Sequence, residues 1–178
     1  MQGMSIFHRR ILRYQLADAF LYWGLIPGAI LVAGTLIDLA FSLPVLPGRM
    51  IRWGGAVFPL VAGLLLIGRA TRDLADRGLG TPNPHQPPRR LVREGVYRLC
   101  RHPMFLGYDL CALAVLLVLG SPGMLVVCFP VFLILQGLFL HKEERYLERR
   151  FPQYPDYQRE VPFLLPRAWP SGGKGRAV

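Results

Sequence analysis

Four long apolar runs alternate with arginine-rich segments along the chain. Because a helix that crosses the hydrocarbon core of a bilayer needs about 20 apolar residues, the pattern predicts an all-α, polytopic membrane protein with about four transmembrane helices. We expect a single membrane-embedded domain over residues 1–178, with spans near residues 19–41, 53–68, 103–120 and 123–140.

The third and fourth runs are joined by a turn of only four residues, 120–123. Glycine and proline favour such turns, so the two helices are expected to fold back antiparallel as a hairpin. The segment that leads into the third run, residues 91–107, then lies at the same end as the polar cluster after the fourth run, residues 141–145. The pattern predicts a polar site at this end, capped by a loop and the C-terminal tail.

The chain combines 52% hydrophobic residues with a net charge of +10. Nucleic-acid-binding proteins are also basic, but their basic residues gather in a patch or stripe. Here the arginines flank the apolar runs. We therefore expect membrane lipids as partners and no nucleic acid.

The distribution of Lys and Arg predicts an orientation, because cytoplasmic segments of membrane proteins are enriched in both. With four spans, 19 of the 21 Lys and Arg residues share one side with the two termini and the central loop, and only Arg49 and Arg52 lie opposite. Both termini and the polar site are expected in the cytoplasm. Residues 1–18 are basic and mildly amphipathic, and form either an interfacial segment or an extra helix.

The start of the third run carries groups that bind anions. Pro103 suits the first position of a helix because it lacks the N–H that would be unpaired there. The free N–H groups of this helix end, with Arg101 and His102 beside them, offer a site for a carboxylate or a phosphate. A helix start with an arginine that reaches the membrane interface explains the same residues without a ligand.

Further along the third run, three more residues extend this site. Phe105 offers an apolar surface to a flat ring, and Gly107 allows close backbone approach. Asp109 follows His102 by seven residues and so lies on about the same helix face. Since an acid inside an apolar span is costly and marks function by default, Asp109 is a candidate catalytic residue; a water-exposed position is the alternative.

Glu143 and Glu144 follow the fourth run, near a helix C-terminus where the helix dipole disfavours negative charge. Neighbouring arginines could compensate, and so could a bound sulfonium or ammonium group. A ribose or an amino group could also donate hydrogen bonds to them. Both glutamates are candidate catalytic and ligand-binding residues.

Other site chemistries have no motif in this sequence: it contains no dinucleotide fingerprint, no Walker loop, no HExxH and no nucleophile elbow. Cys100, Cys111 and Cys128 show no CxxC or metal-binding spacing. The residues alone thus predict a polar membrane-surface pocket, but no reaction type.

An ordered set of motifs fills residues 78–167. It consists of Gly80-Thr81-Pro82-x-Pro84, Leu91-Val92-x-x-Gly95-Val96-Tyr97-Arg98-x-x-Arg101-His102-Pro103-Met104-Phe105-Leu106-Gly107, Glu143-Glu144-x-x-Leu147, Phe151, Tyr154, Tyr157, Val161-Pro162 and Pro166-Arg167. In this order the motifs resemble the isoprenylcysteine carboxyl methyltransferase and phospholipid methyltransferase superfamily of integral membrane enzymes.

The resemblance implies a methyltransferase that uses S-adenosyl-L-methionine and acts on a lipophilic small molecule or a lipidated substrate. By position it implies cofactor contacts from the loop, the helix start and the two glutamates. The candidate cofactor-binding residues are Arg90, Leu91, Val92, Tyr97, Arg101, His102, Pro103, Met104, Phe105, Gly107, Glu143 and Glu144.

The acceptor stays open among a prenylcysteine carboxylate, a phospholipid amine, an isoprenoid or phenolic lipid and a small thiol. Superfamily members often have tyrosine where Phe105 stands. The arginine that helps to bind the prenylcysteine carboxylate has no clear counterpart, His141 and Lys142 being nearest. A carboxylate acceptor needs no base, whereas a thiol or phenol must lose its proton.

Two rival readings also stay open, as does the oligomeric state. Membrane sterol and steroid reductases have a similar hairpin with a histidine-proline segment, but they use NADPH and are longer. A non-enzymatic membrane scaffold would bind anionic lipid through its arginines, and that binding would be indifferent to His102 and Glu143.

Overall fold

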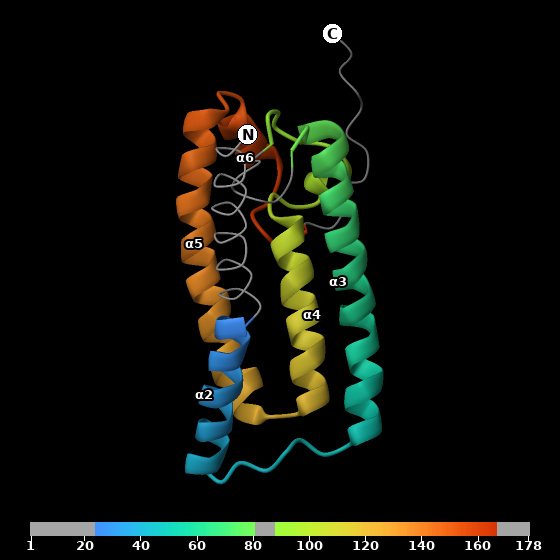
Figure 1. Cartoon of the computed structure of the whole chain (residues 1–178), viewed down its shortest axis with the longest axis vertical. Helices are drawn as coiled ribbons and strands as arrows, with labels where there is room; N and C mark the ends of the chain where they lie inside the picture. The colour runs from blue at the N-terminus through green and yellow to red at the C-terminus, as the bar shows by residue number, and fades with distance from the viewer. Residues whose placement is uncertain (1–23, 81–87, 167–178) are drawn as a thin grey trace, which may run out of the picture.

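The computed structural model describes residues 24–80 and 88–166, which form helices and their connecting loops and contain no strand (Figure 1). The elements are α2 (Ile26–Ala40), α3 (Arg49–Gly78), the short 3-10 helix η2 (Gly95–Arg98), α4 (Pro103–Leu119), the π-helical segment η3 (Gly123–Cys128), α5 (Phe129–Arg150) and α6 (Tyr154–Glu160). The all-α prediction is therefore confirmed. The expected lead-in over residues 1–18, most of the motif at residues 80–84 and Arg167 lie outside the described residues.

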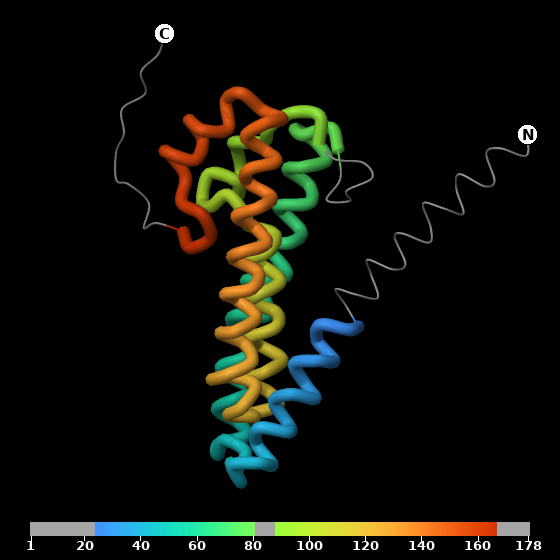
Figure 2. Tube along the Cα trace, turned by 90° about the vertical axis from the view of Figure 1, so that its left-hand side faces the viewer, coloured from blue at the N-terminus to red at the C-terminus, as the bar shows by residue number. Residues whose placement is uncertain are grey.

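Three long helices, α3, α4 and α5, run along the long axis of the molecule (Figure 1). The loop with η2 and the tail with α6 gather at one end, which we call the site end. The connections between α2 and α3 and between α4 and η3 lie at the other, which we call the turn end. Figure 2 shows α2 packing near the turn end and leaning away from the other helices. The fold thus brings the predicted polar segments together at a single end.

Two helical stretches are long and apolar enough to cross a membrane: Arg49–Gly78 and Gly123–Arg150. Only 17% of the apolar window in each is buried within the molecule, so these are not core helices of a globular domain. Large side chains such as Phe58 and Ile134 are exposed on them, and such apolar surface indicates contact with lipid. The apolar helices α2 and α4 are shorter, with 15 and 17 residues. The four-span count therefore stays a prediction.

The helix α3 is much longer than the apolar run 53–68 that predicted it. Beyond Arg69 the helix turns polar on its outer side but still buries Ala70, Leu74 and Gly78, each four residues apart. That spacing keeps one face against the protein. Hydropathy alone locates only the lipid-facing part of this helix. The helix α5 likewise continues ten residues past Leu140 and carries both glutamates.

Charged residues close the turn end. Asp38 accepts hydrogen bonds from the Ser121 hydroxyl and, at 2.7 Å, from the Gly123 N–H. This carboxylate thus caps the start of η3, where the positive end of the helix dipole favours a negative charge. Arg52 Nη1 donates to the Leu119 carbonyl oxygen at 3.0 Å, at the negative end of α4. Each charge lies at the helix terminus that it complements.

Two glycines set the close packing of α3 on α4. A Cβ on Gly63 would lie 2.6 Å from the Gly107 carbonyl oxygen, and a Cβ on Gly107 would lie 2.9 Å from that of Gly63. Neither position has room for a side chain, so the two backbones approach closely, as small residues allow in membrane helices. This contact fixes which face of α4 points away from α3.

Candidate active site

The face of α4 toward α3 is a packing face. Met104 belongs to a core cluster with Ala70, Gly107 faces α3, and Cys111 Sγ lies 4.0 Å from the Leu60 carbonyl oxygen. Met104 and Gly107 were predicted to contact a cofactor. Their observed neighbours explain them by helix packing, and the cofactor contacts stay a prediction.

The opposite face of α4 meets α5 through three pairs of side chains. In order from the site end they are His102 Nε2 with Glu144 Oε1 at 3.2 Å, the rings of Phe105 and Phe139 with centroids 6.4 Å apart, and Asp109 Oδ2 with Gln136 Nε2 at 2.9 Å. As positions rise along α4, their partners fall along α5. The predicted antiparallel hairpin is therefore present, and it brings His102 to the two glutamates.

The start of α4 has the predicted form. Pro103 is its first residue, and His102 precedes it as the N-cap. The Arg101 N–H donates to the Pro162 carbonyl oxygen at 2.9 Å, which holds the tail over this helix start. The ring of Phe163 lies 5.1 Å from the imidazole of His102 and 5.5 Å from the Arg101 guanidinium.

Glu144 is a buried carboxylate surrounded by donors. It is 3% exposed. Besides His102, it accepts hydrogen bonds from the Tyr154 hydroxyl at 3.2 Å and from Gln158 Nε2 at 3.3 Å, and it pairs with Arg101 Nε at 3.2 Å. Burial alone would raise the pKa of Glu144, but the hydrogen bond from His102 and the charge of Arg101 outweigh it and hold the pKa below its usual range. Glu144 is an ionised anchor that joins the hairpin to the tail.

Glu143 differs from its neighbour. Its Oε2 is buried and has no hydrogen-bond partner among the described residues. Burial raises the pKa of Glu143, the charge of His102 offsets only part of this, and Glu144 raises the pKa further. Buried polar atoms are nearly always hydrogen-bonded, so this oxygen is free to accept a hydrogen bond from a ligand.

The loop before α4 is tied to α3 through an acid. Asp73 Oδ2 accepts a hydrogen bond from the Val96 N–H at 2.9 Å, at the start of η2. Gly95 has a positive φ of 61°, and a Cβ there would collide with the Asp73 carboxylate. Only glycine fits both demands. Arg77 pairs with Asp73 at 3.4 Å and with Glu94 at 3.6 Å, which adds a second link.

The tail is tied to the same loop from the other side. The Tyr157 hydroxyl donates to the Tyr97 carbonyl oxygen at 2.6 Å, and Arg150 Nη2 donates to the Pro88 carbonyl oxygen at 2.9 Å. Phe151, Tyr154 and Tyr157 are buried in one cluster. Loop and tail therefore close over the end of the hairpin as one layer.

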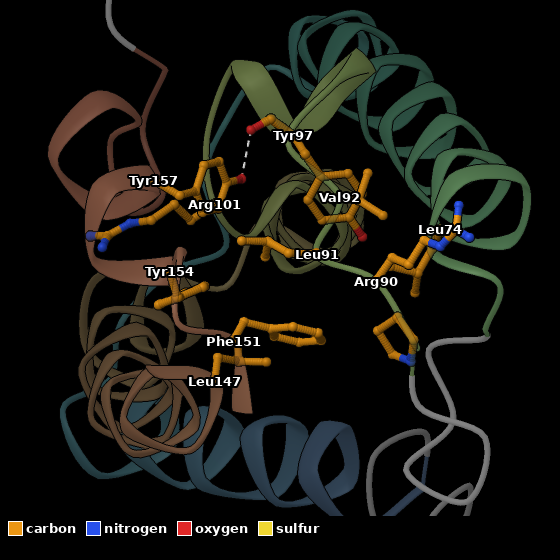
Figure 3. Close-up of a pocket in the computed structure, with 11 residues that line it drawn as sticks. Leu74, Arg90, Leu91, Val92, Tyr97, Arg101, Leu147, Phe151, Tyr154 and Tyr157 are labelled. Carbon is orange, nitrogen blue, oxygen red and sulfur yellow. Dashed lines mark hydrogen bonds between the residues drawn. The ribbon is translucent and has the colours of Figure 1, made fainter. Parts of the chain in front are cut away.

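A cavity of about 60 Å³ lies beneath this layer (Figure 3). Five predicted cofactor-binding residues line it: Arg90, Leu91, Val92, Tyr97 and Arg101. The other lining residues come from α3, the loop, α5 and the tail, and are Leu74, Pro88, Leu147, Phe151, Tyr154 and Tyr157. Ligand pockets commonly measure about 300–1,000 Å³. A nucleoside-sized ligand therefore requires the loop or the tail to move outward.

Several residues of this site were not predicted from the sequence. Gln136 could have been found, because it is an uncharged polar residue inside the fourth apolar run. Gln158 lies on the short helix α6, which no long apolar run marks in the sequence, and Phe163 lies in the irregular segment after it. Within the described residues, no group of three His, Cys, Asp or Glu side chains is placed to hold a metal ion.

Two helices are long and apolar enough to cross a membrane, and a buried acid–histidine cluster lies at one end of the bundle. These are features of a membrane-associated helical protein. The chain belongs to the phospholipid methyltransferase family, whose model matches residues 53–154. Membership confirms the resemblance drawn from the motifs.

Two curated relatives are similar over parts of the chain. The cobalt-zinc-cadmium resistance protein CzcN of Cupriavidus metallidurans is 29% identical over 121 residues, which cover 65% of this chain and 54% of that protein. The nickel-cobalt-cadmium resistance protein NccN of Alcaligenes xylosoxydans xylosoxydans is 30% identical over 81 residues, 43% of this chain and 36% of that protein. The chain thus spans about half the length of these relatives or less. No solved structure matches.

Proposed function

We propose that this chain is a membrane methyltransferase that binds S-adenosyl-L-methionine at the site end and transfers its methyl group to a lipophilic acceptor. The observation that carries the proposal is the unequal pair of glutamates. Glu144 has partners at both oxygens, whereas Glu143 keeps a buried oxygen that no described residue pairs with. Glu144 thus binds protein groups and holds the site together, while Glu143 is left to bind a ligand. A cofactor site needs both kinds of residue.

The residues present fit this cofactor. Glu143 would accept hydrogen bonds from its ribose hydroxyls or its amino group. The first free N–H groups of α4, beside His102, would hold its carboxylate, because a helix N-terminus favours an anion. Phe105 and Tyr97 offer aromatic surface for its base. The bound cofactor supplies a methyl group already activated by the positive sulfur.

The work left to the chain is positioning and the exclusion of water. Glu144 holds Tyr154 on the tail and His102 on the hairpin in one cluster, so the wall of the site is stiff where the two meet. The tail and the loop close the site from the outside through the Tyr157 hydrogen bond. Because the cavity is small, we propose that this layer opens to admit the cofactor and closes over it, as mobile lids do in many enzymes.

The proposal includes the orientation in the membrane. We place the site end, both termini and the central loop in the cytoplasm, with four spans, because this puts 19 of the 21 basic residues on one side. A lipophilic acceptor would then reach the hairpin sideways from the inner leaflet.

Calorimetry on the purified chain in detergent tests the proposal. The variant Glu143→Gln keeps the shape of the side chain but loses its charge, and should weaken binding of S-adenosyl-L-methionine at least tenfold. The exposed acid Glu148 lies on the same helix, so Glu148→Gln is the matched control and should bind as the unchanged chain does. Equal binding by both variants would contradict the proposal. A thermal shift with NADPH and none with S-adenosyl-L-methionine would favour the reductase reading.

A further inference from the structure

Asp109 is the most deeply placed acid on the α5-facing side of α4. It is 6% exposed. Its Oδ2 accepts a hydrogen bond from Gln136 Nε2 at 2.9 Å, but its Oδ1 is buried and has no partner among the described residues. A buried carboxylate oxygen without a donor is costly. Helix packing alone would be served as well by an apolar pair, so this oxygen requires another explanation.

The position of Asp109 relative to the cofactor site is well defined. It follows His102 by seven residues on α4, which is about 10 Å along a helix axis. The aromatic pair of Phe105 and Phe139 lies between these two polar levels. A molecule that enters between α4 and α5 thus meets an apolar layer, with Glu143 on one side of it and the free oxygen of Asp109 on the other.

The packing of α4 against α5 differs from its packing against α3. The glycine contacts bring α3 and α4 together at backbone distance, whereas α5 stands further off and meets α4 mainly through side chains (Figure 1). Phe139, whose ring meets that of Phe105, is 47% exposed, so α5 offers apolar surface beside its contact with α4. A lipophilic molecule has its most direct lateral approach here.

We infer that Asp109 is the base for the acceptor, and that the acceptor is an apolar molecule with an X–H group that must lose a proton, as a thiol or phenol does, and not a carboxylate. This rests on the proposed function. The X–H group of the acceptor donates to Asp109 Oδ1. As the bond from X to the methyl carbon of S-adenosyl-L-methionine forms, the proton would pass to Asp109. The bond between that carbon and the cofactor's sulfur would break, with its electron pair left on the sulfur. Asp109 later releases the proton to water.

The charge at this level sets the specificity. A neutral X–H group gives Asp109 the donor that its free oxygen lacks, and general-base assistance is useful only for an acceptor that must lose a proton. A carboxylate acceptor has no proton to lose and would bring a second negative charge to a buried acid. No Lys or Arg pairs with Asp109 among the described ion pairs, so no described cation offsets that repulsion.

Binding without the cofactor tests the inference apart from catalysis. The probes are 4-octylphenol, its methyl ether 4-octylanisole, which cannot donate a hydrogen bond, and dodecanoate as the carboxylate. The chain in detergent should bind the phenol about tenfold more tightly than the ether, which is about 1.4 kcal/mol, and should bind dodecanoate most weakly. In Asp109→Asn the preference for the phenol should fall below threefold. In Asp38→Asn, an acid at the turn end, it should persist.

Transfer of a labelled methyl group to 4-octylphenol and to octanethiol provides the second readout. Asp109→Asn keeps an acceptor for Gln136, so a purely structural role predicts little loss from it and a larger loss from Gln136→Leu. A catalytic base predicts the reverse: kcat falls at least 100-fold in Asp109→Asn, while the affinity for S-adenosyl-L-methionine changes less than threefold. Preference for a carboxylate acceptor, or an unchanged kcat in Asp109→Asn, would overturn the inference. So would cofactor binding without methylation of either probe, although the proposed cofactor site would then stand.

Discussion

His102 Nε2 lies 3.2 Å from Glu144 Oε1, although 42 positions separate the two residues in the chain. One stands at the start of α4 and the other near the end of α5, so only the antiparallel hairpin can join them. The Tyr154 hydroxyl bonds the same oxygen of Glu144. A single carboxylate therefore connects the hairpin to the tail that closes over it.

We expect the loss of this carboxylate to be strongly destabilising. Glu144→Ala leaves Arg101 without its partner in a site where both side chains are nearly buried, at 12% and 4% exposed. Removal of one partner of a buried ion pair typically costs about 3–5 kcal/mol. Thermal unfolding in detergent, followed by circular dichroism, should show a large drop in Tm. Glu148→Ala, at an exposed position of the same helix, should leave Tm almost unchanged; equal drops would contradict the anchor role.

Loss of the charge of Glu143 should have the opposite effect and stabilise the folded chain. Its pKa in the folded chain is raised above its ordinary value of 4.5, chiefly by burial. At a pH between the pKa of Glu143 in the unfolded chain and its higher pKa in the folded chain, the folded state keeps a proton that the unfolded chain releases. The free energy of unfolding therefore falls as the pH rises through this window. Glu143→Gln removes the ionisation. The variant should be more stable than the unchanged chain at neutral pH, and this advantage should disappear below about pH 4, where the acid is protonated in both states.

A pH series of melting curves measures this difference, with Glu148→Gln as the control. If Glu143→Gln lowers Tm at neutral pH, then Glu143 has a stabilising partner and is not held for a ligand. Together with the calorimetry, the expected result would show a site residue that costs stability and contributes binding, a common balance at functional sites.

The contrast between the two glutamates shows which features of the site could be predicted from the sequence and which could not. Apolar runs and the short turn at residues 120–123 were sufficient to predict the helical hairpin and the meeting of His102 with Glu144, whereas η2 and α6 were not predicted. The different roles of Glu143 and Glu144 were not predictable, because adjacent residues on a helix point about 100° apart and the donors that decide between them come from the tail. Tyr154 and Gln158 lie on α6, a helix of only seven residues, which is too short for a hydrophobic period to show which side chains face the hairpin.

The same limit applies to the helix start and to α3. Phe105 and Gly107 were both read as part of one ligand site, whereas the structure turns Phe105 toward α5 and Gly107 toward α3. Which face of α4 meets which helix depends on the order of helices around the bundle, and one sequence does not specify that order. Hydropathy also ends α3 at residue 68, since its last ten residues are polar outside and apolar only along one narrow face.

The glycine contact between α3 and α4 gives a prediction that is independent of any cofactor. Gly63→Ala places a methyl group 2.6 Å from the Gly107 carbonyl oxygen and 2.7 Å from Cys111 Sγ, so the helices must separate. Such overpacking typically costs about 1–3 kcal/mol. Gly68→Ala on the same helix meets nothing within 4 Å and should be neutral or stabilise by about 0.4–1 kcal/mol. Thermal unfolding of both variants in the same detergent measures the contrast, and equal effects would refute the close crossing.

The hydrogen bond from the Tyr157 hydroxyl to the Tyr97 carbonyl oxygen, at 2.6 Å, should act as a latch between tail and loop. Tyr157→Phe removes only the hydroxyl and should cost about 1 kcal/mol, while the ring stays in its cluster with Tyr154. Because this hydrogen bond resists opening of the layer, its loss should speed hydrogen exchange and limited proteolysis in residues 88–102 and 151–166, with α3 unaffected.

Tyr146 is 58% exposed, so Tyr146→Phe is the matched control and should exchange like the unchanged chain. Faster exchange along α3 as well would mean that Tyr157 supports the whole fold and does not latch the tail.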